Sequence, residues 1–141
     1  MNWNIVSAIG TIMAAFVGIA GIWINIYDKK KRLDIHFEMV PLPKIYLSNN
    51  STRSVTIIKM LYSVNNHVFY VEYFEGLQEI VLLPSTSQTL YLNNKNMLDS
   101  YYDHKMDSLC NPNEKINIVL YDNYMRKYTI KTGFDIGTFK N

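Results

Sequence analysis

The chain divides near residue 30 into two stretches in which hydrophobic and polar positions follow different patterns. Residues 3–27 contain no charged side chain. The rest of the chain carries short runs that alternate between apolar and polar residues, separated by clusters rich in Asn, Ser and Pro. A long apolar run predicts a helix, whereas alternation with a period of two predicts half-buried strands. We therefore expect one N-terminal helix followed by a mainly β domain.

The apolar run is long enough to cross a membrane. As a helix, residues 3–27 would extend about 37 Å at ~1.5 Å per residue, which exceeds the ~30 Å hydrocarbon core of a bilayer. Trp3 and Trp23 lie near its two ends, where aromatic rings favour the interface. A cleaved signal peptide would show a basic start, a shorter apolar core and a small-residue cleavage site, and the sequence shows none of these. We expect a transmembrane helix and its basic flank in residues 1–32, and a separate domain in residues 33–141.

The charges that flank the run predict its orientation. A dense basic run follows it, made of Lys29, Lys30, Lys31 and Arg32. The positive-inside bias keeps such a run in the cytoplasm, so we expect a single-pass protein of the cell membrane with its N-terminus outside and its C-terminal domain cytoplasmic. The same four residues are expected to contact lipid headgroups, at about 1 kcal/mol per basic residue on an anionic surface. The net charge of +2 is too small to indicate a nucleic-acid partner.

Small and polar residues form a seam along the expected helix, which we call the helix seam. In steps of three and four residues it comprises Ser7, Thr11, Ala14, Gly18, Gly21 and Asn25, with Asn4 one step before it. In lipid, helices associate through close backbone approach and interhelical hydrogen bonds, and small residues favour both. Glycine and alanine are also common in isolated membrane helices, but here large aliphatic residues avoid the seam. We expect it to pack against another helix, either in a homo-oligomer or in a different membrane protein.

The rest of the chain predicts a β-sandwich. Expected strands cover residues 33–39, 45–47, 54–62, 68–74, 80–83, 88–92, 115–121 and 124–130. Asn65-Asn66 and Asp122-Asn123 are typical of turns, and Asp122-Asn123 predicts a two-residue hairpin because both residues tolerate positive φ. Short strands at regular spacing with turn chemistry between them indicate a sandwich or barrel.

One segment of the domain departs from the strand pattern. Residues 96–107 place Leu98, Tyr102 and Met106 on one helical face, which predicts a short helix packed on the sandwich. Asp99, Asp103 and Asp107 recur every four residues on another face. Such a stripe is able to hold a hard cation, but like charges at this spacing are more often solvated, and we expect a solvated face.

The sequence offers no constellation for catalysis. His36, His67 and His104 are scattered, and no spacing typical of zinc ligands is present. Cys110 has only His104 and Lys105 near it, so a small buried thiol is the expected role. Many tyrosines fall at strand spacing, which favours packing over base stacking. We expect no metal, no cofactor, no small-molecule substrate and no enzymatic activity.

The order of turns and strands carries a resemblance. The turn Leu83-Pro84-Ser85-Thr86-Ser87, the strand after it and the late hairpin through Asp122-Asn123 resemble immunoglobulin-like domains. The whole layout is similar to small membrane-anchored proteins of A/T-rich bacterial and prophage genomes. The resemblance implies an immunoglobulin-like sandwich that binds other proteins or serves as a scaffold.

Two functions follow from these expectations. The first is a membrane-tethered, non-catalytic module that recruits or senses a partner, while its helix packs in an oligomer or beside another membrane protein. The second is a membrane effector, of a phage-defence or cell-killing type, in which clustering assembles the seam into a membrane-disrupting bundle.

Overall fold

The computed structural model describes residues 3–30 and 33–140, with side chains described for residues 5–23 and 33–140. Contacts divide the chain into two compact units, Met1–Arg32 and Leu33–Asn141. Strands hold 43% of the residues and helices 31%, so the protein is mainly β, as the alternation predicts.

The first unit is a single helix, α1, which runs from Trp3 to Lys30. The sequence prediction of an apolar N-terminal helix is confirmed. Its segment Ile5–Trp23 has a mean hydropathy of 2.2, and by length and composition it is the one such segment, among the described residues, that is able to cross a membrane. None of the side chains described along it is buried.

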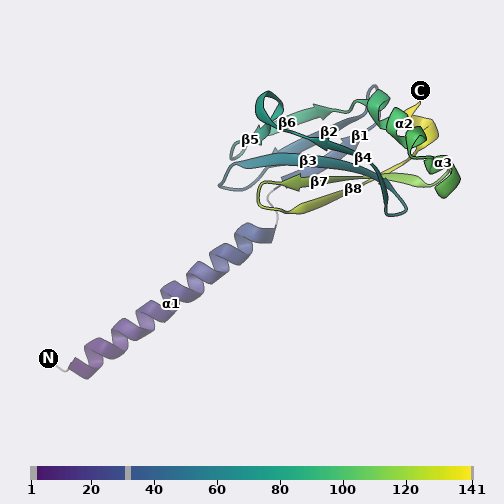
Figure 1. Cartoon of the computed structure of the whole chain (residues 1–141). Coiled ribbons are helices and arrows are strands. Elements are labelled where there is room, and N and C mark those ends of the chain that lie inside the picture. The colour runs from purple at the N-terminus through teal and green to yellow at the C-terminus, as the bar shows by residue number, and fades with distance from the viewer. Residues whose placement is uncertain (1–2, 31–32, 141) are drawn as a thin grey trace. The chain divides into compact units, whose positions relative to one another are not determined.

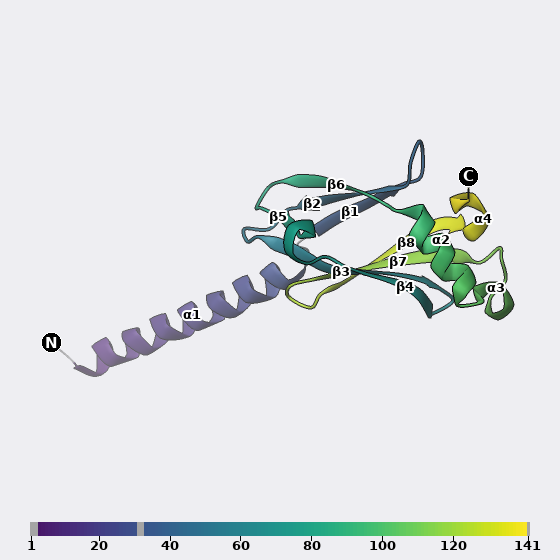
Figure 2. The same cartoon turned by 45° about the horizontal axis from the view of Figure 1, so that its top comes forward.

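The second unit contains two antiparallel sheets. The three-stranded sheet has the order β1-β2-β6 and is built from β1 (Leu33–Glu38), β2 (Lys44–Asn49) and β6 (Ser87–Tyr91). The five-stranded sheet has the order β4-β3-β7-β8, with β5 also paired to β3. Its strands are β3 (Val55–Val64), β4 (His67–Tyr73), β5 (Ile80–Leu82), β7 (Lys115–Asp122) and β8 (Lys127–Asp135). Figures 1 and 2 show the two sheets as separate layers.

The core lies between these two layers. From the three-stranded sheet, Ile45 and Leu47 are fully buried, and from the five-stranded sheet Ile57, Ile118 and Leu120 join the same cluster. Burying a side chain of this size contributes about 1.5–3 kcal/mol. The alternation of apolar and polar residues along the strands therefore reflects which side chains face this shared core.

Short helices close one end of the two sheets. They are α2 (Asn94–Asp103) and α3 (Met106–Leu109) between β6 and β7, and α4 (Ile136–Phe139) after β8. A 3-10 turn, η1 (Gly76–Gln78), joins β4 to β5. Tyr101 of α2 meets the ring of Phe69 edge to face at 5.2 Å, which fixes α2 against β4.

The prediction of one helix over residues 96–107 is wrong in two respects. The helix begins at Asn94 and is broken at Lys105, which has a positive φ of 51°. Met97 and Tyr101 are its buried residues, whereas Leu98 is half-buried and Tyr102 exposed. After the break the helix resumes as α3, so Met106 reaches the core from a different helix than Met97 and Tyr101. The residues of the segment therefore do not share a single helical face.

The two expected hairpin turns differ in outcome. Asn65 and Asn66 both have positive φ, 48° and 67°, and join β3 to β4 as predicted. The two-residue hairpin at Asp122-Asn123 is wrong, because Asp122 ends β7 and the positive φ falls at Met125. The N–H of Met125 donates to the carbonyl of Asp122 at 2.9 Å, which makes a longer loop. Strand β8 accordingly begins at Lys127, not at residue 124.

Candidate functional site

The helix seam lies along α1 with its described side chains exposed. Ser7, Thr11, Ala14, Gly18 and Gly21 are all exposed, and a Cβ added at Gly18 or Gly21 would meet no atom of this chain within 4 Å. The Thr11 hydroxyl donates to the Ser7 carbonyl at 3.0 Å, so this polar group is satisfied within its own helix. The side chain of Asn25 lies outside the described residues, as do those of Asn4, Lys29, Lys30, Lys31 and Arg32.

Several side chains of the domain were singled out by the sequence as candidates for chemistry, and the structure places them as follows. Among the described residues, no three His, Cys, Asp or Glu side chains form a group able to hold a metal ion. Cys110 is buried, and burial raises the pKa of its thiol, with the nearby Glu114 carboxylate adding to the effect. A protonated thiol is a poor nucleophile. Asp99, Asp103 and Asp107 are all exposed, and the break at Lys105 divides them between two helices.

The outer face of the five-stranded sheet gathers side chains from four strands into paired rows. Paired residues of neighbouring strands point to the same side of a sheet. One row crosses the sheet as Tyr73, Lys59, Tyr121 and Lys127, and the next as Val71, Leu61, Val119 and Thr129. Asn117 and Lys131 pair in a third row. We call this surface the basic face.

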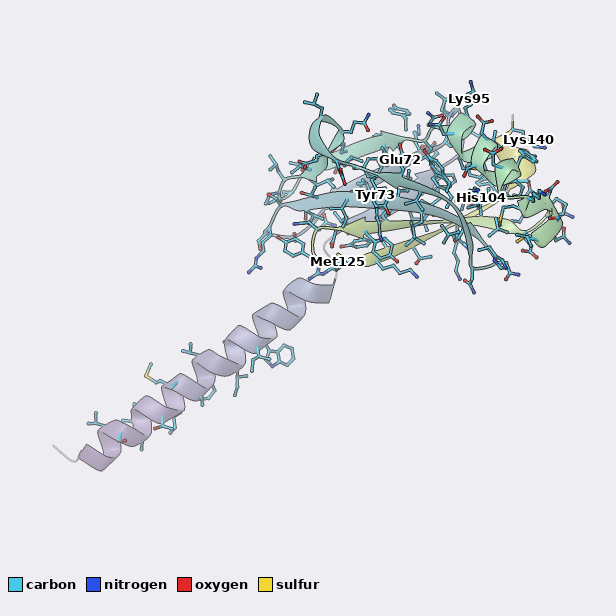
Figure 3. The ribbon with its side chains drawn as sticks, in the orientation of Figure 1. Glu72, Tyr73, Lys95, His104, Met125 and Lys140 are labelled. Atoms are coloured by element: carbon cyan, nitrogen blue, oxygen red, sulfur yellow. The ribbon has the colours of Figure 1, made fainter. Side chains whose placement is uncertain are left out.

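The basic face combines aromatic, aliphatic and positively charged groups. The Lys59 ammonium lies 4.5 Å from the centre of the Tyr121 ring, a cation–π contact between neighbouring strands. Tyr73, labelled in Figure 3, is 61% exposed. Its three lysines, Lys59, Lys127 and Lys131, have no carboxylate within ion-pair distance among the residues that the structure describes.

The outer face of the three-stranded sheet is different, and we call it the paired face. The Tyr46 hydroxyl donates to Glu38 at 2.8 Å, and the Lys44 ammonium lies 3.2 Å from the same carboxylate. These hydrogen bonds, that of Tyr46 first, lower the pKa of Glu38 below its ordinary value. Asn50 donates to Asp34 at the other end of β1. On this face, Glu38 and Lys44 are thus matched within the chain, and Asp34 is held by a neutral amide.

A hollow of about 540 Å³ lies between the edge strands β1 and β8. Its lining includes Ile35, Phe37 and Phe134, with His36, Tyr128 and Lys131 as its ionisable groups. Polar and apolar side chains both line the hollow, so it is a trough of mixed character between two strand edges.

Sequence reasoning named the helix seam but did not identify the basic face. The signal is present at alternate positions of the expected strands, since residues 59, 121, 127 and 131 are Lys, Tyr, Lys and Lys. Their convergence depends on the pairing of β3 with β7 and of β7 with β8. The pairing of β3 with β7 brings together residues 59 and 121, which lie more than fifty positions apart, and no local pattern encodes it.

Comparisons with known proteins add little to this geometry. No protein-family model matches the chain, and no curated protein matches it. A solved structure of a protein from Archaeoglobus fulgidus is similar over 74% of this chain and 98% of that one, with 13% identity and a TM-score of 0.28. A similarity this weak bears on neither fold nor function.

Proposed function

We propose that the protein is a membrane-tethered, non-catalytic interaction module, in which α1 spans the bilayer once and the basic face of the β domain binds another protein. The observation that carries the proposal is the exposure of Ile5–Trp23, a segment of mean hydropathy 2.2 in which no residue is buried. Leaving nineteen such residues in water would cost about 25 cal/mol for each Å² of apolar surface. A bilayer removes that cost.

The proposed orientation places the domain in the cytoplasm. The basic residues that follow α1 favour the cytoplasmic side, and the N-terminus would then cross to the outside. A buried, unpaired Cys110 is compatible with a reducing compartment.

We further propose that the domain is an immunoglobulin-like sandwich, related in layout to small membrane-anchored proteins of bacteria and prophages. The strand order supports this assignment. Strands β1, β2 and β6 take the places of strands A, B and E, while β3, β7 and β8 take those of C, F and G. Strand β4, at the edge beside β3, corresponds to the added strand C′.

The chemistry of the basic face indicates the kind of protein it binds. Exposed aromatic and aliphatic side chains supply contact area, and three lysines without a carboxylate partner in the described structure favour an acidic surface. Partners that already lie in the membrane would be aligned by packing against the helix seam. In this proposal the helix seam of α1 selects the membrane protein, and the basic face binds an acidic surface of that same protein.

Fractionation and a topology reporter test the anchor. The full chain should stay with the membrane after carbonate extraction, and a reporter fused after Asn141 should be active only in the cytoplasm. A chain released by carbonate, or a periplasmic reporter signal, would overturn the proposal.

A matched pair of substitutions tests the helix seam. Gly18→Ile fills the open space beside the backbone, whereas Ile19→Leu conserves volume off the seam. Interhelical hydrogen bonds in membranes average about 0.6 kcal/mol, and we expect the loss of one packing contact to be of similar size. Gly18→Ile should therefore weaken crosslinking in membranes about threefold, while Ile19→Leu leaves it unchanged. Liposome dye leakage by the unmodified chain would instead favour the membrane-disrupting bundle. The Thr11–Ser7 hydrogen bond weighs against that alternative, because it leaves one fewer polar group free to line a pore.

A further inference from the structure

We infer that the acidic partner of the basic face binds as an extended segment, which adds a β-strand to the free edge of β8 and places alternate side chains in the hollow beside it. The inference rests on the function proposed above, because β8 carries Lys127 and Lys131 of the basic face. The occupant is a strand of another protein in which acidic and apolar residues alternate.

Strand β8 has one edge with which no other described strand pairs. It lies at the end of the order β4-β3-β7-β8 and pairs only with β7 (Figure 1). Its nine residues make it longer than β1 and β6, the edge strands of the other sheet, which have six and five residues. An unpaired edge of this length is a template on which another chain is able to add a strand.

The hydrogen-bond pattern shows which backbone groups of this edge are unused. The Asp122 N–H donates to the Arg126 carbonyl at 3.2 Å, so these two residues form a hydrogen-bonded pair. In an antiparallel ladder, hydrogen-bonded and non-hydrogen-bonded pairs alternate. Counting along β8 from Arg126, the residues Lys127, Thr129 and Lys131 belong to pairs of the second kind. Their N–H and C=O groups therefore point away from β7, toward the free edge.

The same three residues give this edge its charge. Lys127, Thr129 and Lys131 are exposed, and their side chains belong to the basic face. A residue added directly opposite each of them would point to that same face. Acidic residues opposite the two lysines would therefore meet ammonium groups that have no carboxylate within ion-pair distance in the described structure. Asp135, the acidic residue of β8, lies 3.6 Å from the Lys115 ammonium instead.

The hollow of about 540 Å³ receives the other side chains of the added strand. It lies beside this edge, between β8 and β1. Tyr128 and Ile130 alternate with the exposed residues of β8 and line the hollow. Ile35, Phe37 and Phe134 line it as well, and the rings of Phe37 and Phe134 meet at 6.1 Å between their centres. Residues opposite Tyr128 and Ile130 would enter the hollow and contact these apolar side chains.

These positions together specify the sequence of the occupant. Opposite residues 127–131, the added strand carries an acidic residue, an apolar one, a residue of any kind, an apolar one and an acidic one. The acidic pair faces the lysines, and the apolar pair faces the hollow. Backbone hydrogen bonds supply affinity in strand addition, and the alternate side chains supply specificity.

The same charges exclude two other arrangements. A second copy of β8, paired about Thr129 in antiparallel fashion, would place Lys127 opposite Lys131 of the second copy, and like charges directly opposite one another are destabilising. The edge of β1, across the hollow, carries Asp34 and Glu38 at its outward positions. An acidic strand is therefore better matched to β8 than to β1.

A labelled peptide and the full chain in phosphatidylcholine nanodiscs test the inference. The peptide repeats glutamate, valine, threonine and valine, ends on glutamate and has neutral caps, and its binding is followed by fluorescence anisotropy. Replacing its glutamates by lysines should weaken binding at least about tenfold. Methyl groups on every second backbone nitrogen should weaken binding about tenfold for the set of amides that faces β8, and less than about twofold for the other set. Equal binding of both methylated peptides and their parent would overturn strand addition.

Substitutions at Thr129 test the same hydrogen bonds from the side of β8. Thr129→Pro removes the N–H that points to the free edge, a position that proline is able to occupy in an edge strand. It should weaken binding of the acidic peptide at least about tenfold, whereas Thr129→Val keeps the N–H and should change binding less than about twofold. Melting temperatures check that both variants fold. If Thr129→Pro is unfolded, the methylated peptides decide the question on the unmodified chain.

Crosslinking of the full chain to its membrane partner separates two kinds of failure. If Lys131→Glu lowers crosslinking while Thr129→Pro and peptide methylation have no effect, the basic face binds through its side chains and strand addition is wrong. If none of these changes has an effect, the inference and the proposed binding surface both fall. Equal binding of the glutamate and lysine peptides would overturn the acidic character of the occupant.

Discussion

The two outer faces of the β domain rest on one core yet differ in chemistry. On the paired face, Glu38 is hydrogen-bonded by Tyr46 and lies in an ion pair with Lys44. On the basic face, Lys127 and Lys131 are exposed beside Thr129, and no carboxylate belongs to the paired rows. Solubility alone requires only that both faces be polar.

The two faces differ in whether their charged side chains have partners within the chain. Groups matched within the chain stabilise the fold and leave little to offer a partner. Groups left unmatched contribute less to folding and more to association, because their charge and apolar area become fully engaged only when another surface arrives. Substitutions that affect both faces, one face or the protonation of a single carboxylate should separate the contributions to folding from those to association.

The largest effect should come from Asn49, which supports both faces at once. Its side chain is fully buried and donates to the carbonyls of Leu82, in the other sheet, and Arg53 at 2.9 and 2.8 Å. Asn49→Ala leaves buried groups unsatisfied and should lower the free energy of unfolding by about 2–3 kcal/mol. The exposed neighbour gives the control, since Asn50→Ala should cost less than about 1 kcal/mol. Urea unfolding of the two variants measures both, and equal midpoints would contradict this role.

Charge reversal of the basic face should act on association and not on folding. Thr129→Glu with Lys131→Glu replaces exposed side chains on β8 and should reduce crosslinking to the membrane partner at least about tenfold, which corresponds to ~1.4 kcal/mol. The melting temperature should stay close to that of the unmodified protein. Lys95→Glu, on α2, is the control that reverses one charge away from this face. Undiminished crosslinking in the double variant would remove the basic face as the binding surface.

A matched pair of Tyr→Phe substitutions compares the faces directly. Tyr46→Phe removes a hydroxyl that donates to Glu38, and should lower the melting temperature by about 2–5 °C. Tyr73→Phe removes an exposed hydroxyl for which the described residues provide no hydrogen-bond partner, and should change it by less than about 1 °C. Calorimetry distinguishes the two, and a larger effect at Tyr73 would reverse the comparison.

The smallest effect concerns the proton on Glu38. Its folded-state pKa is lowered by the hydrogen bonds from Tyr46 and Lys44, so the unfolded chain binds the proton more tightly. The resulting stabilisation is present above the ordinary pKa of a glutamate and is lost as the pH falls through the lower folded value. Glu38→Gln should therefore destabilise the domain at neutral pH but have no effect once the pH is below that range. Thermal melts across the acid range measure this, and a constant difference at every pH would contradict it.

Much of the fold is predictable from local patterns, because half-buried strands record the position of the core at every second residue. This alternation predicts the strands that begin near residues 33, 55, 115 and 127, and the turn chemistry predicts Asn65-Asn66. The break at Lys105 does not, since an unfavourable φ at one residue is imposed by packing on both sides of it. The turn after Asp122 was mispredicted for a related reason, because a buried carboxylate organises it from within β7.

The candidate surfaces divide in the same way. The helix seam is a property of one helix and can be found by stepping along it, and its role in association stays a prediction. The basic face depends on pairing between strands, so the sequence contains its residues but does not show which of them become neighbours. The hydrogen bonds of Asn49 to Leu82 and Arg53 likewise depend on packing between separate segments, which no local pattern predicts.

The pairing of β1 has a mechanical consequence. Residues Leu33 to Glu38 pair with β2 in one unbroken antiparallel ladder, and Leu33 is the residue through which the N-terminal segment enters the domain. Hydrogen bonds in such a ladder lie perpendicular to the strands. Tension applied at Leu33 along the strand therefore loads the whole ladder in shear, so that its bonds resist together, whereas tension across the strand would open them one at a time. The β1–β2 ladder can therefore carry tension along β1 before it opens.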